Sequence, residues 1–253
     1  MTRGAEGVSM DTTHGNILDF GMDTITLSGS LPAKLAAVRA AGFTQIMLSA
    51  KDLANHPDGI DAAVRAVKDS GLRVTGFQVL RDFEGLSGHL HEYKIAVAKS
   101  MLEMAHAVGA DILLVCSSTS THASADLDAQ ARDLRKLAML ALPLGIRIAY
   151  EGLSWGRTVN ELTTAWDVIC RADAPNLGIG FDSFHAIASK TSLDDLDILT
   201  PDKIYLVQLA DFVLYDEQRW TMSPHSAGRH ELLPAPLWLE DVNAVPDVDV
   251  LAR

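Results

Sequence analysis

Three residues that can hold a metal ion follow successive apolar runs of the chain. Glu151, Asp182 and Gln208 each stand directly after a short run typical of a buried strand, and His185 lies one helical turn beyond Asp182. In a parallel barrel the carboxyl ends of the strands share one mouth, so we expect these side chains to converge. Carboxylate and amide oxygens suit Mg²⁺ or Mn²⁺, and Co²⁺ or Zn²⁺ is also compatible. Taken alone, each residue could instead be a solvated residue at a strand end.

A repeating strand–helix unit must position these residues. Apolar runs alternate with amphipathic segments that end at Gly or Pro, and this pattern predicts an α/β fold with a parallel sheet and right-handed crossovers. Seven such units favour a TIM-type (β/α)8 barrel over an open doubly wound sheet. No G-x-G-x-x-G motif follows the first strand, which weakens the alternative of a dinucleotide-binding fold. The expected strands are Met22–Leu27, Gln45–Leu48, Val74–Gln78, Ile112–Cys116, Ile146–Tyr150, Leu177–Phe181 and Lys203–Leu209. The expected helices are Leu31–Ala41, Ile60–Ser70, Glu92–Val108, Ala125–Leu142, Val159–Arg171 and Leu193–Leu199.

The repeat fails beyond Asp211, where too few residues remain for a loop, a helix, an eighth strand and a closing helix. In one interpretation Leu237–Leu239 is the eighth strand and Glu240 at its end supplies a fourth ligand. In the other, which we favour, Val248–Arg253 begins the seventh helix and the barrel is incomplete at its C-terminal end. The fourth ligand is then Glu240, Glu231 or absent.

Composition limits the partners of the chain. It has 253 residues and a formal net charge of −12, which argues against binding to nucleic acid or to an anionic membrane surface and favours a small-molecule substrate. No apolar stretch is long enough to span a membrane. Cys116 and Cys170 lack the spacing of a disulfide framework, which fits a cytoplasmic protein. We expect residues 1–16 to be a disordered leader and residues 17–253 to form one barrel domain.

Four segments carry a resemblance to a known family. They are Phe77–Gly85, Tyr150–Arg157, Phe181–His185 and Val207–Asp211. With these segments the chain resembles the xylose-isomerase-like barrel superfamily of sugar phosphate isomerases and epimerases, and within it the bacterial 3-dehydroshikimate dehydratases. The resemblance implies metal ligands at Glu151, Asp182 and Gln208. Relatives carry a fourth ligand, a Glu ending the last strand, but Glu240 comes earlier than that position, and Met47–Lys51 ends the second strand without the Glu usual there.

Dehydration of a β-hydroxy ketone requires removal of a proton next to the carbonyl, stabilisation of the enolate and an acid for the departing hydroxyl. A divalent ion can stabilise the enolate, and His185 titrates near neutrality, which suits proton transfer. Arg81 at the mouth end of the third strand presents a planar fork to a substrate carboxylate, and Arg229 can do the same. The ordinary alternative for Arg81 is a surface ion pair with Asp82 or Glu84.

Three hypotheses follow. The first is a metal-dependent lyase of quinate/shikimate catabolism that converts 3-dehydroshikimate to protocatechuate. The second is a sugar or sugar-phosphate isomerase or epimerase that uses the same ion to stabilise an enediolate. The third is a degenerate, non-catalytic barrel that binds a carboxylated ligand or a partner chain. The resemblance also implies that two copies can pair as a homodimer.

Overall fold

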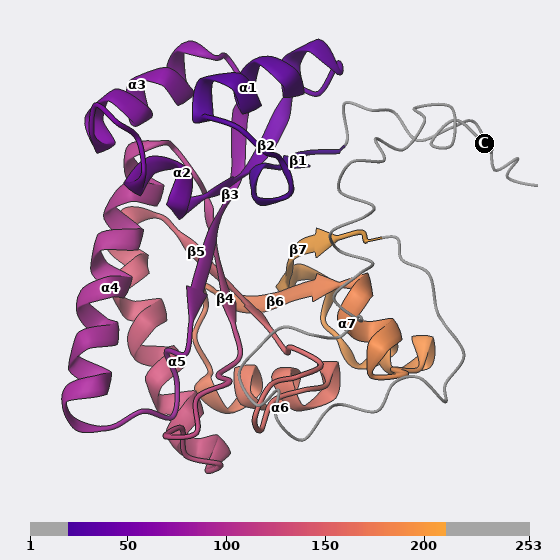
Figure 1. The fold of residues 1–253 in the computed structure, drawn as a ribbon. Coiled ribbons are helices and arrows are strands. Elements are labelled where there is room, and N and C mark those ends of the chain that lie inside the picture. The colour runs from indigo at the N-terminus through magenta and orange to yellow at the C-terminus, as the bar shows by residue number, and fades with distance from the viewer. Residues whose placement is uncertain (1–19, 211–253) are drawn as a thin grey trace, which may run out of the picture. The chain divides into compact units, whose positions relative to one another are not determined.

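The computed structural model describes residues 20–210 (Figure 1). The expected leader, the two alternatives for the C-terminal end, and Arg229, Glu231 and Glu240 lie outside the described residues. Within this part of the chain, no helix has the length and hydropathy needed to cross a membrane.

The described residues contain a parallel sheet with the strand order β1-β2-β3-β4-β5-β6-β7. Each strand after β1 pairs in parallel with the strand that precedes it in the chain, so the expected α/β architecture of consecutive strand–helix units is confirmed. The sheet curls as an incomplete barrel. Its strands are β1 (Met22–Asp23), β2 (Gln45–Ser49), β3 (Arg73–Arg81), β4 (Ile112–Cys116), β5 (Arg147–Glu151), β6 (Leu177–Asp182) and β7 (Ile204–Gln208).

Helices connect the strands, and α4 and α5 lie side by side along one face of the sheet (Figure 1). The α-helices are α1 (Leu31–Ala40), α2 (Ala50–Ala54), α3 (Ile60–Asp69), α4 (Gly88–Ala107), α5 (Leu127–Ala141), α6 (Leu162–Ala172) and α7 (Ser183–Ala188). Short 3₁₀ helices are η2 (Thr24–Thr26), η3 (Leu142–Leu144), η4 (Leu193–Ile198) and η5 (Pro201–Lys203).

The predicted first strand, Met22–Leu27, is wrong beyond Asp23. The carboxylate of Asp23 accepts a hydrogen bond of 2.8 Å from the backbone N–H of Ile25, and this cap turns the chain into η2. The short helices α2 and α7 are not among the elements predicted from the sequence. In α7 the local cause is similar, because Asp182 accepts a bond of 2.7 Å from the N–H of Phe184.

The core lies between the sheet and the helices that cover it. The strands β2 and β4 are buried along their whole length, as expected for parallel strands with both faces covered. Phe77, Tyr150, Leu113 and Leu134 are among the side chains that solvent does not reach. Each such side chain contributes about 1.5–3 kcal/mol through removal of apolar surface from water. This packed interior holds the carboxyl ends of the strands in fixed positions.

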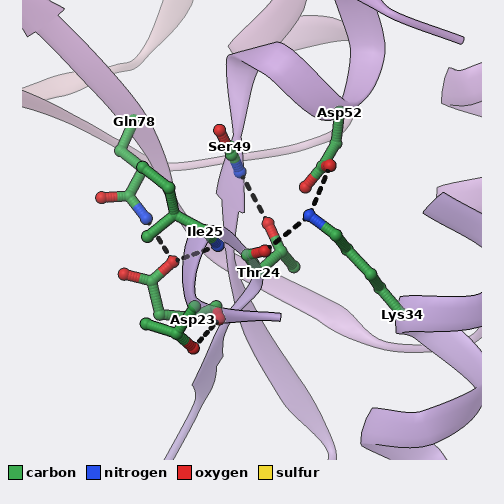
Figure 2. A network of polar contacts seen from close by, with 8 residues as sticks. Asp23, Thr24, Ile25, Lys34, Ser49, Asp52 and Gln78 are labelled. Atoms are coloured by element: carbon green, nitrogen blue, oxygen red, sulfur yellow. Dashed lines mark hydrogen bonds and ion pairs between the residues drawn. The ribbon is translucent and has the colours of Figure 1, made fainter. Parts of the chain in front are cut away.

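A polar network joins the mouth ends of β1, β2 and β3 (Figure 2). The ammonium group of Lys34 on α1 donates to the carbonyl oxygen of Thr24 and to a carboxylate oxygen of Asp52 on α2, each over 2.8 Å. The side chain of Gln78 on β3 donates to Asp23. The network therefore fixes the turn that follows β1 against the helices α1 and α2 and the strand β3.

Hydrogen bonds also connect the mouth loops that follow β3 and β4. Asp82 has a positive φ of 51°, and its carboxylate accepts bonds from the backbone N–H and the hydroxyl of Thr119. The buried carboxylate of Glu84 accepts from the N–H of Ser118 over 2.5 Å and from the hydroxyl of Tyr150 over 3.0 Å. These bonds join the two loops to each other and, through Tyr150, to β5.

Candidate metal centre

Three of the residues singled out in the sequence come together at the mouth. Glu151 at the end of β5, Asp182 at the end of β6 and His185 on α7 each offer an atom that can bind a metal, and these atoms lie within 4.8 Å of one another. Gln208 at the end of β7 is the register partner of Asp182, so the two side chains belong to the same face of the sheet. A small pocket adjoins Glu151, Asp182 and His185.

Glu151 has one oxygen with a partner and one without. Its Oε2 accepts a bond of 2.9 Å from the thiol of Cys116, whereas Oε1 is buried and has no hydrogen-bond partner within residues 20–210. Burial raises the pKa of Glu151 to about 7; the Cys116 bond opposes this rise and the nearby Asp182 carboxylate adds to it. A buried carboxylate oxygen without a partner is costly, and a cation would relieve that cost. The residues present therefore fit a divalent ion.

Asp182 also caps the start of α7, where its carboxylate accepts the bond from the N–H of Phe184. Its pKa is raised, chiefly by burial, against the bond that its carboxylate accepts from the N–H of Phe184; the charge of Asp23 adds to the rise. This last effect places Asp23 of β1 within electrostatic reach of β6. Both Glu151 and Asp182 thus gain from a positive charge between them, as two neighbouring carboxylates in a buried site do.

His185 is buried and its ring is fixed on several sides. Its Nδ1 accepts a bond of 3.2 Å from the backbone N–H of Ser154, and the hydroxyl of Ser154 lies at the same distance. The rings of Trp155 and Phe184 meet it edge to face, with centroid distances of 4.7 and 5.2 Å. Burial first, and then the charge of Arg81, lower the pKa of His185 to about 4, so the near-neutral titration expected from the sequence is wrong for this buried ring.

The bond to Ser154 decides which nitrogen of His185 carries the proton. A backbone N–H can only donate, so Nδ1 accepts and the neutral ring carries its proton on Nε2. In this tautomer Nε2 has no lone pair for a metal ion. The arrangement favours a hydrogen-bonding or proton-transfer role for His185 over the role of a ligand.

Arg81 ends β3, and its guanidinium charge lowers the pKa of both Glu151 and His185. It is therefore within electrostatic reach of the candidate metal centre. The carboxylates of Asp82 and Glu84, the ordinary partners proposed for it, are bonded to the loop after β4.

Sequence reasoning missed Cys116, Ser154 and Glu84 as parts of this site. Cys116 ends β4, so the strand-end rule that found the ligands could also have found it. Ser154 contacts His185 across 31 residues of chain, and no pattern in the sequence indicates that contact. The burial of Glu84 follows from the path of the loop after β3.

Comparison with known proteins identifies the family. The family model described as xylose isomerase-like TIM barrel matches residues 35–234. The chain belongs to this family. A curated relative from Pseudomonas aeruginosa, named 3-dehydroshikimate dehydratase, is 40% identical over 189 residues, which are 74% of this chain and 30% of that protein. The chain thus spans about a third of the length of this relative.

Solved structures agree on the fold of this xylose isomerase-like barrel. A xylose isomerase-like TIM barrel/4-hydroxyphenylpyruvate dioxygenase fusion protein is 36% identical, with a TM-score of 0.71 over 76% of this chain and 31% of that chain. The IolI protein, whose structure has a binding zinc atom, has a TM-score of 0.66 at 20% identity over 76% of this chain and 73% of its own. At that identity, the second likeness concerns the fold alone.

Proposed function

We propose that this chain is a divalent-metal-dependent lyase that dehydrates 3-dehydroshikimate to protocatechuate. The observation that carries the proposal is the meeting of Glu151, Asp182 and His185 within 4.8 Å at one end of the sheet. The name of the Pseudomonas aeruginosa relative, at 40% identity, supports the substrate and the reaction.

Glu151, Asp182 and Gln208 would hold the ion. Two carboxylates and a neutral amide oxygen balance the charge of a divalent ion, leave coordination positions open and suit Mg²⁺ or Mn²⁺, with Co²⁺ and Zn²⁺ as alternatives. When bound, a divalent ion supplies a Lewis acid that polarises the carbonyl next to the C–H bond to be broken. The unpartnered Oε1 of Glu151 supports this assignment.

His185 would act on the substrate from the α7 side of the mouth. With its proton on Nε2, the neutral ring donates a hydrogen bond to an oxygen that gains negative charge. In this tautomer the ring can release only the proton on Nε2, toward the departing hydroxyl, because the N–H of Ser154 at 3.2 Å holds Nδ1 as an acceptor. Ser154 therefore supports proton transfer by His185.

Arg81 would bind the substrate carboxylate. It stands at the mouth end of β3 within electrostatic reach of Glu151 and His185, and its planar guanidinium matches a carboxylate with two parallel hydrogen bonds. Arg229, outside the described residues, is proposed for the same role. A carboxylated small molecule is thus the expected ligand.

The proposal is tested with protein stripped of metal by a chelator and reloaded with Mg²⁺, Mn²⁺, Co²⁺ or Zn²⁺ in turn. With 3-dehydroshikimate added, we expect the ultraviolet absorbance of protocatechuate to rise in at least one loaded sample and in none of the stripped samples. Glu151→Gln should abolish both ion binding and turnover. Glu103→Gln, which changes an exposed carboxylate on α4, is the matched control and should retain both.

Absence of product with every ion would refute the lyase proposal. If substrate hydrogen then exchanges with heavy water in a panel of ketoses, the isomerase or epimerase hypothesis takes its place. If Glu151→Gln changes neither the metal content nor any turnover, the non-catalytic hypothesis is favoured.

A further inference from the structure

The side chain of Cys116 lies directly against the candidate ligand Glu151. Cys116 ends β4, Glu151 ends β5, and the two residues are register partners in the parallel ladder. Both side chains are buried, and the Cys116 sulfur lies 2.9 Å from Oε2 of Glu151. An ionised carboxylate can only accept, so the thiol is the donor in this contact.

The contact distinguishes the two oxygens of Glu151. Its Oε2 accepts from the thiol, whereas Oε1 is buried and finds no hydrogen-bond partner in the part of the chain that the structure describes. Rotation of the carboxylate would break the hydrogen bond between the Cys116 thiol and Oε2. The thiol therefore holds the orientation in which Oε1 is the oxygen left for a ligand.

We infer that Cys116 is a positioning residue whose thiol directs Glu151 to bind a divalent cation through Oε1 alone. The inference rests on the metal site of the proposed function and adds a residue to it. Cys116 acts through Glu151 and is not itself a ligand. Hydrogen bonds from outside the ligand set commonly tune metal affinity in this way, and their loss typically weakens it about 10–100-fold.

The chain has only two cysteines, which makes the test clean. Cys170 is exposed on α6, so Cys170→Ser provides a background in which every thiol signal comes from Cys116. In that background we would compare Cys116→Ser, which keeps a donor, with Cys116→Ala, which removes it. Cys116→Val removes the donor while nearly preserving the volume, and replaces Cys116→Ala if that variant does not fold.

The readout is the affinity for Mn²⁺ in the absence of substrate, measured by titration calorimetry. We expect Cys116→Ala or Cys116→Val to weaken binding about 10–100-fold and Cys116→Ser to remain within a few-fold of the background protein. Equal losses in the serine and alanine variants would show a packing role and overturn the inference. Unchanged affinity in the alanine variant would also overturn it.

A second readout separates a positioning thiol from a ligating thiolate. Co²⁺ bound by a thiolate gives an intense sulfur-to-metal charge-transfer band in the near ultraviolet, and soft thiolate ligands favour such ions. We expect no such band in the background protein. A band that Cys116→Ser abolishes would assign the sulfur as a ligand and refute the inference.

These measurements need no substrate, so their outcome is independent of the reaction. If the background protein binds ions and the cysteine variants behave as expected, the inference holds even when no protocatechuate forms. If the protein turns over substrate but Cys116→Ala binds Mn²⁺ normally, only the inference fails. If the protein binds no ion, both proposals fall.

Discussion

At the scale of single residues, two buried carboxyl groups differ in what their surroundings offer. Glu151 faces the candidate metal centre, where a cation can compensate its charge. Glu84 is equally buried, and its Oε1 accepts from the N–H of Ser118 and the hydroxyl of Tyr150, whereas its Oε2 has no hydrogen-bond partner among residues 20–210. Burial raises the pKa of Glu84 to about 7 from an ordinary 4.5. Glu84 is therefore a structural residue with an electrostatic cost near neutral pH.

The raised pKa of Glu84 predicts a pH dependence of stability. The folded chain binds this proton more tightly than the unfolded chain, so the stabilising contribution is complete below about pH 4.5 and is lost as the pH rises through about 7. Over that range the loss is on the order of 3 kcal/mol, because each pKa unit corresponds to about 1.4 kcal/mol. Glu84→Gln keeps an oxygen acceptor without the charge and should flatten this decline in urea unfolding of chelator-treated protein. An unchanged pH profile would contradict the assignment.

His185 is predicted to serve the reaction rather than the metal. We expect His185→Gln to reduce kcat by about 10²–10⁴-fold, the usual contribution of a proton-transfer group. The affinity for Mn²⁺ should change little, because the Nε2 of the native tautomer offers no lone pair. Ser154→Ala should lower kcat to a smaller extent without affecting Mn²⁺. A loss of Mn²⁺ binding in His185→Gln would identify the histidine as a ligand.

At the scale of elements, the shortest strand, β1, is held by side-chain polar contacts as well as by its hydrogen bonds to β2. The strand β1 has only two residues, and the turn after it is held by Lys34, whose ammonium group reaches Thr24 and Asp52 (Figure 2). The Lys34 and Asp52 side chains are each only 10% exposed. The ion pair therefore joins the first turn of the sheet to α1 and α2 in a setting where neither charge tolerates the loss of its partner.

Removing one charge of this pair is predicted to destabilise the fold strongly. Lys34→Met should lower the free energy of unfolding by about 3–5 kcal/mol, because it leaves Asp52 buried without a counter-charge. Adding Asp52→Leu should recover most of the loss. Lys51→Met on the exposed side of α2 is the control and should stay within about 0.5 kcal/mol. Urea unfolding measures all three, and a double variant no better than Lys34→Met would refute the explanation.

At the scale of the whole molecule, the candidate metal centre joins separate strand–helix units. Glu151 and Asp182 come from consecutive strands, and Gln208 from the next strand. An ion bound by all of them would link the last strands of the described sheet in the folded state only. Anything that binds the folded chain and not the unfolded chain stabilises it by mass action.

Metal removal is therefore predicted to lower thermal stability. An ion at about 100 times its Kd contributes about 2.7 kcal/mol, which for a chain of this size corresponds to a Tm shift of about 5–10 °C. Addition of a chelator should remove that increment, and re-addition of Mn²⁺ should restore it, in differential scanning calorimetry. Glu151→Gln should show the lower Tm with or without the ion. A parent protein whose Tm ignores both chelator and Mn²⁺ would contradict the metal site.

The sequence by itself determined the strand–helix order and the strand-end positions of Glu151, Asp182 and Gln208. Alternation of apolar runs with amphipathic segments is a local signal, and parallel crossover geometry then fixes which strand ends share a mouth. The sequence did not determine where the first strand ends, because the side-chain cap from Asp23 overrides the β-branched run after Asp23.

Only the tertiary structure decided which side chains of the site form hydrogen bonds with one another. The bonds from Cys116 to Glu151, from Ser154 to His185 and from Ser118 to Glu84 each join residues 31 to 35 positions apart in the chain. Such contacts depend on register between strands and on loop paths. A sequence pattern with a period of 2 or 3.6 residues carries no information about either.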